Sequence, residues 1–210
     1  MAGTPIIELR GVNAGYGAID ILHDIDLAVE PGEVLVVLGA NGAGKTTLTR
    51  VIAGELAPRR GDLFIGGRRM NGARPHALAR AGVCTIPEGR GVFPNLTVAE
   101  NLLMMTHRGR SRREVESIAY DAFPRLAERR DQLAGTMSGG EQQMLALARA
   151  LTTRPGVLIV DELSMGLAPL VVRELFSTLE RLAADGLSIL IVEQFADLAL
   201  DMAHRAVVLA

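Results

Sequence analysis

The sequence of 210 residues has one cysteine, no tryptophan and a single lysine. Because Cys84 stands alone, a disulfide framework within the chain and a four-cysteine metal cluster are both excluded, and a reducing compartment is the expected setting. The longest apolar stretches, such as 34–38 and 187–192, are far shorter than the roughly 18 residues that a membrane-spanning helix needs. No basic segment followed by an apolar run opens the chain, so we expect no secretory signal and a place in the cytoplasm.

A large excess of charge is also missing. The net charge of −2 argues against broad electrostatic binding of nucleic acid, so we expect no nucleic-acid partner. Of the 22 Lys and Arg residues, all but Lys45 are arginine. We therefore expect position 45 to have a role that arginine cannot fulfil. The length and the hydrophobic share of 49% predict one globular domain, residues 1–210, with a substantial core.

Strand-like and helix-like segments alternate along the chain, which is typical of a mostly parallel sheet flanked by helices. The alternation within 19–29 predicts that residues 21, 23, 25, 27 and 29 share one face of a strand. The region of about 95–150 is polar and helical, with capping-box patterns at Thr97-x-x-Glu100 and Ser111-x-x-Glu114. We therefore expect a helical subdomain inserted into an α/β core. The strands are predicted at 6–12, 19–29, 33–39, 63–65, 83–87, 157–160, 188–192 and 206–209, the last running to the end of the chain.

Residues 39–46, Gly-Ala-Asn-Gly-Ala-Gly-Lys-Thr, match the P-loop pattern and stand between a predicted buried strand and a predicted helix. Glycines let backbone N–H groups wrap around a polyphosphate, and the positive end of the following helix favours its charge. Lys45 would reach the terminal phosphates as a compact charge, a task for which the planar guanidinium is poorly suited. The Thr46 hydroxyl would ligate Mg²⁺. A polyphosphate with Mg²⁺ is thus the predicted ligand, held by Gly39, Ala40, Asn41, Gly42, Ala43, Gly44, Lys45, Thr46 and Thr47.

Two carboxylates end the apolar segment 157–160, at the strand end where open α/β sheets bind ligands. Asp161 would hold Mg²⁺, directly or through water, and Glu162 would orient and deprotonate an attacking water. A polar strand end that leads into a turn is the simpler alternative.

A second glycine-assisted helix start is found at 137–143, Met-Ser-Gly-Gly-Glu-Gln-Gln. Ser138 and the free N–H groups of Gly139 and Gly140 would form another anion site. One nucleotide seldom needs two such sites in one subunit.

The P-loop at 39–46, the segment 137–141 and Asp161-Glu162 follow one another in an order that resembles the ATP-binding subunits of ABC transporters over essentially the whole chain. The resemblance implies a P-loop NTPase (RecA-like) α/β core with N-terminal antiparallel strands and an inserted helical subdomain. It also implies a Mg-dependent ATPase coupled to transport.

Two ATPase subunits, the same chain or a related one, are implied to face each other head to tail. Ser138, Gly139, Gly140 and Glu141 of one subunit would close over ATP held by the P-loop of the other. Tyr16, in Gly-Tyr-Gly at 15–17, would stack on the adenine, although from the residues alone a turn residue is an equal alternative.

The chain departs from the commonest pattern of this family at three places, and these departures point to one subgroup. Glu88 stands where most members have Gln, Gln194 stands where most have His, and the loop 163–169 lacks the usual terminal Asp. Together these resemble the subgroup that powers branched-chain amino-acid importers, with urea and amide importers nearby. The resemblance places Glu88 near the metal and Gln194 at the catalytic site. Gln194 can hydrogen-bond a γ-phosphate but cannot titrate, which leaves Glu162 as the base.

The implied partners are transmembrane permease subunits and, indirectly, a solute-binding protein. The chain would sit peripherally on the inner face of the cell membrane, with the apolar loop 93–97 as the expected permease contact. Two alternatives stay open: an ABC-type ATPase that serves no transporter, for example in cofactor assembly, and a P-loop kinase. A kinase would need an acceptor pocket and a lid, and it has no use for residues 138–140.

Overall fold

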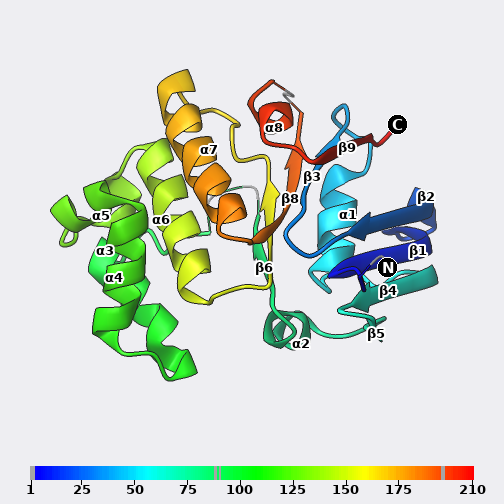
Figure 1. Cartoon of the computed structure of the whole chain (residues 1–210), viewed down its shortest axis with the longest axis horizontal. Coiled ribbons are helices and arrows are strands. Elements are labelled where there is room, and N and C mark those ends of the chain that lie inside the picture. The colour runs from blue at the N-terminus through cyan, green and yellow to red at the C-terminus, as the bar shows by residue number, and fades with distance from the viewer. Residues whose placement is uncertain (1–2, 88, 90, 195–196) are drawn as a thin grey trace.

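A five-stranded parallel sheet divides the molecule into two layers (Figure 1). The computed structural model describes residues 3–87, 89, 91–194 and 197–210. The strand order is β6–β7–β8–β3–β9, and each neighbouring pair is parallel. The sheet contains β3 (Val34–Leu38), β6 (Val83–Ile86), β7 (Val157–Asp161), β8 (Ser188–Glu193) and β9 (Arg205–Val208).

A second, antiparallel sheet has the order β2–β1–β4–β5 and lies beyond α1 in Figure 1. It contains β1 (Ile7–Tyr16), β2 (Ile19–Val29), β4 (Arg60–Ile65) and β5 (Arg68–Arg69). The expectation that residues 21 to 29 alternate without interruption was wrong. Leu22 is buried and His23 is exposed, because the β1–β2 register shifts near Asp24, whose φ of 50° is left-handed. Such a bulge moves the side chains before it to the other face.

Every described element between β6 and β7 is helical. Thr97 caps α3 with a full capping box, and the side chain of Ser111 caps α4, so both predicted helix starts are confirmed. No helix in the described ranges combines the length and the apolar character needed to span a bilayer. The helices are α1 (Lys45–Ile52), α2 (Pro75–Arg80), α3 (Val98–Leu103), α4 (Arg112–Ala122), α5 (Pro124–Glu128), α6 (Gly139–Thr152), α7 (Pro169–Ala184) and α8 (Asp197–Asp201), with 3₁₀ turns at Met104–Arg108 and Ala134–Thr136.

Two hydrophobic cores lie on the two faces of the parallel sheet. Successive residues of β3 alternate between them: Val34 and Val36 pack with α3–α7, whereas Leu35 and Val37 pack with α1 and the antiparallel sheet. Because side chains of a strand alternate faces, the strand reads as an unbroken apolar run and is buried on both sides. The sheet therefore separates α1, which follows the P-loop, from α6, which follows Ser138 (Figure 1).

Candidate active site

The P-loop joins the end of β3 to the first residue of α1. Its tight path depends on Gly42 and Gly44, whose φ angles of 86° and 96° are left-handed, and Gly44 is the N-cap of α1. A residue with a side chain would be strained in that conformation. The loop therefore leaves the N–H groups at the start of α1 available to an anion.

A cavity of about 400 Å³ opens beside this loop. It brings together P-loop residues, the end of β1 and the segment after β7, which are far apart in the sequence. Of the predicted ligand residues, Ala40 and Asn41 are exposed, whereas Gly44, Lys45 and Thr47 are buried. The lining is formed by Tyr16, Ile21, Asn41, Gly42, Gly44, Lys45, Thr46, Thr47, Glu162 and Met165.

The side chain of Lys45 is only 4% exposed, and its ammonium is held by three oxygen-bearing partners. Its Nζ donates hydrogen bonds to the carbonyls of Gly39 at 2.9 Å and Ala40 at 3.2 Å. The third partner is the carboxylate of Glu162, with Oε1 at 3.4 Å. A buried ammonium needs such partners, and this one is fixed at the mouth of the anion-binding loop.

Glu162 follows the last residue of β7 in a left-handed conformation with φ of 50°. That conformation is costly for a residue with a side chain, by roughly 1–3 kcal/mol, and is typical of functional sites. The N–H of Glu162 donates to the carbonyl of Val192 at 2.8 Å, which ties the turn to β8. The carboxylate is thereby aimed into the cavity rather than along the strand.

Asp161 is buried and its Oδ2 accepts a hydrogen bond from Thr49 Oγ1 at 2.9 Å. Thr49 Oγ1 also lies 3.0 Å from the carbonyl of Thr46, so one hydroxyl links α1 to β7. A smaller cavity of about 150 Å³ is lined by both Thr46 and Asp161. These hydroxyl and carboxylate oxygens are of the kind that Mg²⁺ prefers. Glu88, the third predicted metal residue, lies outside the described residues.

Tyr16 lines the large cavity and is 44% exposed. Its hydroxyl accepts a hydrogen bond from Arg50 Nη1 at 3.1 Å, which fixes the ring beside α1. The ring is thus at the cavity as well as at a strand end, and its stacking on an adenine stays a prediction.

Ser138 is exposed and caps α6. The N–H and Oγ of Ser138 both donate to Glu141 Oε2, at 2.9 and 2.8 Å, while Arg129 Nε holds the other carboxylate oxygen at 2.5 Å. Burial acts to raise the pKa of Glu141, but the hydrogen bonds from Arg129 and Ser138 outweigh it and lower that pKa. Glu141 therefore stays ionised and keeps the cap rigid.

Gly140 is buried against α7, unlike exposed Ser138. A Cβ built at Gly140 would lie 2.2 Å from Cγ1 of Val171, so the glycine lets α6 and α7 approach closely. Gly139 lies between these extremes and is half-buried.

The P-loop and Ser138 lie toward the same edge of the parallel sheet, but on opposite faces. Only residues 153–156 connect the end of α6 to the start of β7, so α6 runs back alongside its strand and its first turn lies near the carboxyl ends of the strands. The P-loop follows the carboxyl end of β3. Within one chain, the sheet keeps the P-loop and Ser138 apart.

No separate signal in the sequence pointed to Thr49 or to the support of the loop after Glu162. That loop is held by Glu193, whose carboxylate accepts the N–H and the Oγ–H of Ser164, both at 2.9 Å. Burial raises the pKa of Glu193, against the effect of these hydrogen bonds. Gln194 is exposed directly after β8. The cavity lining includes Glu162 and not Gln194, so a catalytic role for Gln194 stays a prediction.

The fold and the phosphate-binding loop define a P-loop NTPase cassette, in agreement with the predicted fold class. The sequence model described as "ABC transporter" matches residues 22–164. The chain belongs to the ABC transporter family, and it is an ATP-binding ATPase subunit of that family.

Two curated relatives cover nearly the whole chain. One is the high-affinity branched-chain amino acid transport ATP-binding protein BraG of Pseudomonas aeruginosa, 42% identical over 97% of this chain and 88% of that protein. Another is the probable branched-chain amino acid transport ATP-binding protein LivF of Archaeoglobus fulgidus, 37% identical over 94% of this chain and 85% of that protein. Both names describe ATP-binding proteins of branched-chain amino acid transport, in agreement with the subgroup resemblance.

Solved structures agree in fold. The ADP conformation of MJ1267, an ATP-binding cassette of an ABC transporter, has a TM-score of 0.86 and 25% identity, over 98% of this chain and 87% of that chain. A dimeric cassette, MJ0796 bound to ADP and Pi, has a TM-score of 0.85 over 97% of this chain and 94% of that chain. At 23% identity the latter bears on the fold alone.

Proposed function

We propose that this chain hydrolyses ATP at the Lys45–Glu162 cavity to drive an importer for branched-chain amino acids. The observation that carries the ATPase assignment is the 3.4 Å approach of Glu162 to Lys45. It places a carboxylate at the position where a terminal phosphate would meet the P-loop lysine. The names of the two relatives support the choice of cargo.

In the proposed reaction, ATP binds with its phosphates along the P-loop N–H groups and its terminal phosphate at Lys45. Glu162 holds a water and accepts its proton as the water oxygen bonds to the γ-phosphorus and the bond to the ADP oxygen breaks. Tyr16 stacks on the adenine. Gln194 hydrogen-bonds the γ-phosphate in this proposal, and the exposed position after β8 leaves it room to do so.

Thr46 and Asp161 would hold Mg²⁺, with Glu88 proposed nearby. Among the described residues no group of three or more His, Cys, Asp or Glu side chains is placed to hold a metal. That fits Mg²⁺, which usually takes one or two protein oxygens and completes its shell with phosphates and water. When bound, the ion would neutralise charge that develops on the phosphates. Thr49 would keep Asp161 oriented toward the ion.

The proposed active unit contains two cassettes. Ser138 is exposed at the edge where the P-loop opens, yet the sheet separates the two within one chain. A second subunit, the same chain or a related one, placed head to tail would bring its own Ser138, Gly139 and Glu141 over the bound ATP. Gly140 would act in this proposal by letting α6 lie close to α7.

Residues 93–97 are the proposed contact with a membrane permease, at the inner face of the cell membrane. Phe93 is 44% exposed, and its backbone is fixed because Asn101 pairs with both its N–H at 2.9 Å and its carbonyl at 3.0 Å. Arg149 stacks on the ring with its guanidinium carbon 4.7 Å from the centroid. An apolar side chain on a rigid loop suits docking to another protein.

The proposal is tested by reconstitution. The chain is expressed together with permease and solute-binding proteins of a branched-chain amino acid importer, and uptake of labelled leucine, urea and short amides into proteoliposomes is measured. ATP-dependent leucine uptake supports the proposal, while uptake of urea alone would reassign the cargo. Label transferred from ATP to a small acceptor instead of free phosphate would indicate a kinase. Failure to co-purify with any permease would favour an ATPase outside transport.

A further inference from the structure

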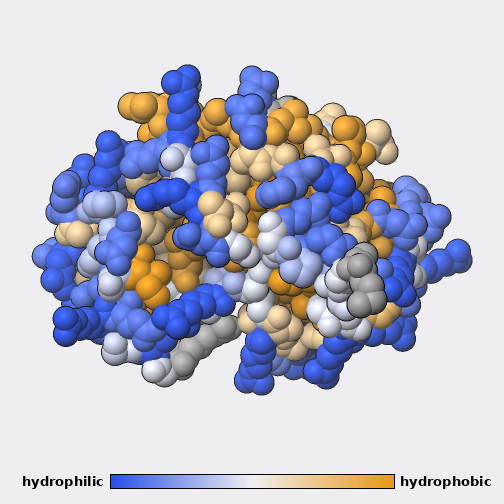
Figure 2. Space-filling model, in the orientation of Figure 1, coloured by the Kyte–Doolittle hydropathy of each residue, from blue (hydrophilic) through white to orange (hydrophobic). Residues whose placement is uncertain are grey.

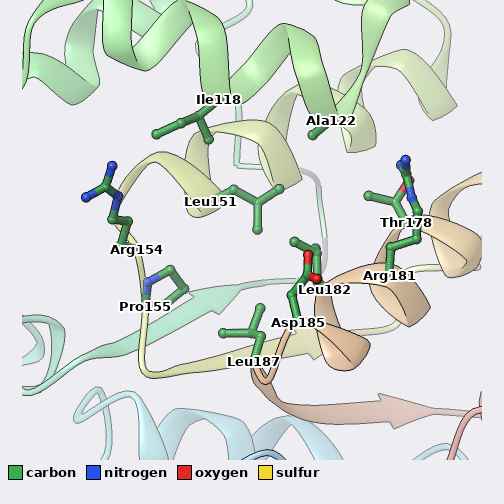
Figure 3. A pocket seen from close by; sticks show the side chains of 10 residues that line it. All are labelled: Ile118, Ala122, Leu151, Arg154, Pro155, Thr178, Arg181, Leu182, Asp185 and Leu187. Atoms are coloured by element: carbon green, nitrogen blue, oxygen red, sulfur yellow. The ribbon is translucent and has the colours of Figure 1, made fainter.

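A second cavity, of about 430 Å³, lies far from the P-loop edge. It is bounded by α4, the end of α6, the end of α7 and the segments that lead into β7 and β8, so it lies at the amino ends of the parallel strands (Figure 3). Its volume is within the range of small-molecule sites, roughly 300–1,000 Å³. The floor and walls are apolar and are formed by Ile118, Ala122, Leu151, Pro155, Leu182 and Leu187.

Charged groups stand only at the rim of this cavity. Arg154 lies at one side and Arg181 at the other, and Asp185 lies between them beside Leu182 (Figure 3). Figure 2 shows a patch of hydrophobic surface among hydrophilic side chains over α4 and α6. An apolar hollow with a few fixed charges at its edge is typical of a site for a small amphipathic ligand.

Arg181 and Asp185 are the informative pair. Arg181 is in the last turn of α7 and Asp185 is the C-cap of that helix, four residues later, the spacing at which opposite charges on a helix often meet. Two pairs with the same spacing and order on or beside α4 do meet: Arg110 with Glu114 at 2.7 Å and Arg112 with Glu116 at 2.8 Å.

Within the described part of the chain, Arg181 and Asp185 form no ion pair with each other or with any other residue. Arg181 Nη2 instead lies 3.3 Å from Thr178 Oγ1, inside the cavity wall. Arg154, by contrast, is engaged by Glu114 Oε1 at 3.1 Å. Among the described residues, the guanidinium of Arg181 and the carboxylate of Asp185 therefore stand at the rim without an ion-pair partner, next to an apolar hollow.

We infer that this cavity binds an aliphatic α-amino acid. The carboxylate of the amino acid would pair with Arg181, its ammonium with Asp185, and its branched side chain would enter the hollow between Leu151, Leu182 and Leu187. A plain fatty acid would leave Asp185 unmatched beside a carboxylate, and an amine would leave Arg181 unmatched. The zwitterion is the small ligand class that satisfies both charges.

The inference rests on the chemistry of this cavity and extends the proposed function, since the ligand class coincides with the proposed cargo. Its occupant would touch α6, whose N-cap is Ser138, and α7, which follows the loop after Glu162. The site would therefore let the ATPase sense the amino acid at a place separate from the nucleotide.

Isothermal titration calorimetry with L-leucine, without nucleotide or permease, tests the inference. Isocaproate lacks the ammonium of leucine and isoamylamine lacks its carboxylate, so both should bind at least about tenfold more weakly than leucine. Arg181→Gln and Asp185→Asn should each weaken leucine binding by a similar factor. Arg173→Gln and Glu180→Gln, exposed on the same helix away from the cavity, are the matched controls and should bind as the original chain does.

Absence of leucine binding at millimolar concentration would overturn the inference, as would Arg181→Gln and Asp185→Asn variants that bind leucine as tightly as the original chain. If isocaproate binds as tightly as leucine, the ligand of this cavity would be a simple carboxylate and the inferred amino acid would be wrong. Both rim residues are exposed, so their variants should unfold at the temperature of the original chain. ATP hydrolysis and uptake are measured separately, so the proposed function stands or fails on its own data.

Discussion

The Nζ of Lys45 and the Oε1 of Glu162 lie 3.4 Å apart, although more than a hundred residues separate them in the sequence. The lysine comes from the first turn of α1, and the glutamate follows β7 in a left-handed conformation. Their approach brings the anion-binding loop and a candidate base into one cavity. Because the two charges are this close, a change in the charge of either group changes the electrostatic environment of the other.

Glu162→Gln should abolish most ATP hydrolysis while preserving ATP binding. The amide has nearly the same shape but cannot accept the proton of a water, so turnover should fall by about 10²–10⁴-fold. Removing the negative charge beside Lys45 also makes the site more favourable for phosphates. Phosphate release and equilibrium nucleotide binding are the two measurements, with Glu180→Gln on the surface of α7 as the control. Near-normal turnover would exclude Glu162 as the base.

Lys45→Arg should fail as completely as Lys45→Ala. The lysine side chain is buried and its ammonium fits between two carbonyls, whereas the larger planar guanidinium cannot reproduce that geometry. We expect ATP to bind at least about tenfold more weakly in both variants, because a charged hydrogen bond is lost. Titration with a fluorescent ATP analogue measures this. Arg80→Lys, exposed on α2, is the control, and full affinity in Lys45→Arg would contradict the assigned role.

Features that depend on residues adjacent in the sequence could be predicted from the sequence. The P-loop glycines, the caps at Thr97 and Ser111 and the acidic end of β7 are each encoded by a few consecutive residues. Local backbone chemistry determines such features, so their positions in the fold agree with the pattern. The family resemblance added the two-sheet architecture and the order of the motifs.

Features that depend on tertiary packing could not be predicted. The bulge at Asp24 arises from the pairing of β1 with β2, and a period-two pattern does not contain it. Thr49 and Glu193 look like ordinary helix and strand residues, and only the approach of distant segments gives them Asp161 and Ser164 as partners. Likewise, the sequence pattern predicted Gly140 to be an anion ligand, whereas in the structure this glycine also allows α6 and α7 to pack closely.

Gly140→Ala should destabilise the fold. Alanine is the better helix former by about 1 kcal/mol, but its Cβ would meet stiff, branched Val171 at 2.2 Å. Overpacking of this kind costs roughly 1–3 kcal/mol, so the net free energy of unfolding should fall. Val171→Ala removes the clashing methyl groups, and the double variant should recover about 1 kcal/mol relative to additivity. Urea denaturation gives the four values, and strictly additive effects would rule out the contact.

Glu193→Gln should stabilise the protein increasingly as pH rises. Burial raises the pKa of Glu193 in the folded chain, so its contribution to stability is full below the ordinary glutamate pKa of about 4.3. That contribution is lost as pH rises through the folded pKa, because the unfolded chain ionises more readily. Gln stays neutral and can still accept from Ser164. Thermal unfolding from pH 4 to 8 measures the difference in stability between Glu193→Gln and the original chain. This difference should grow as pH rises, and a difference that stays constant with pH would contradict the prediction.

Phe93→Glu should uncouple the ATPase from transport. The new carboxylate would lie beside Arg149, which now stacks on the ring, and Asn101 would still hold the loop backbone, so the fold and basal hydrolysis should be retained. A charge on an apolar docking residue should remove leucine uptake and permease co-purification. Phe64 provides a matched control, since Arg10 covers its ring at the same 4.7 Å on the antiparallel sheet, and Phe64→Glu should leave uptake intact. Normal uptake with Phe93→Glu would place the permease contact elsewhere on the molecule.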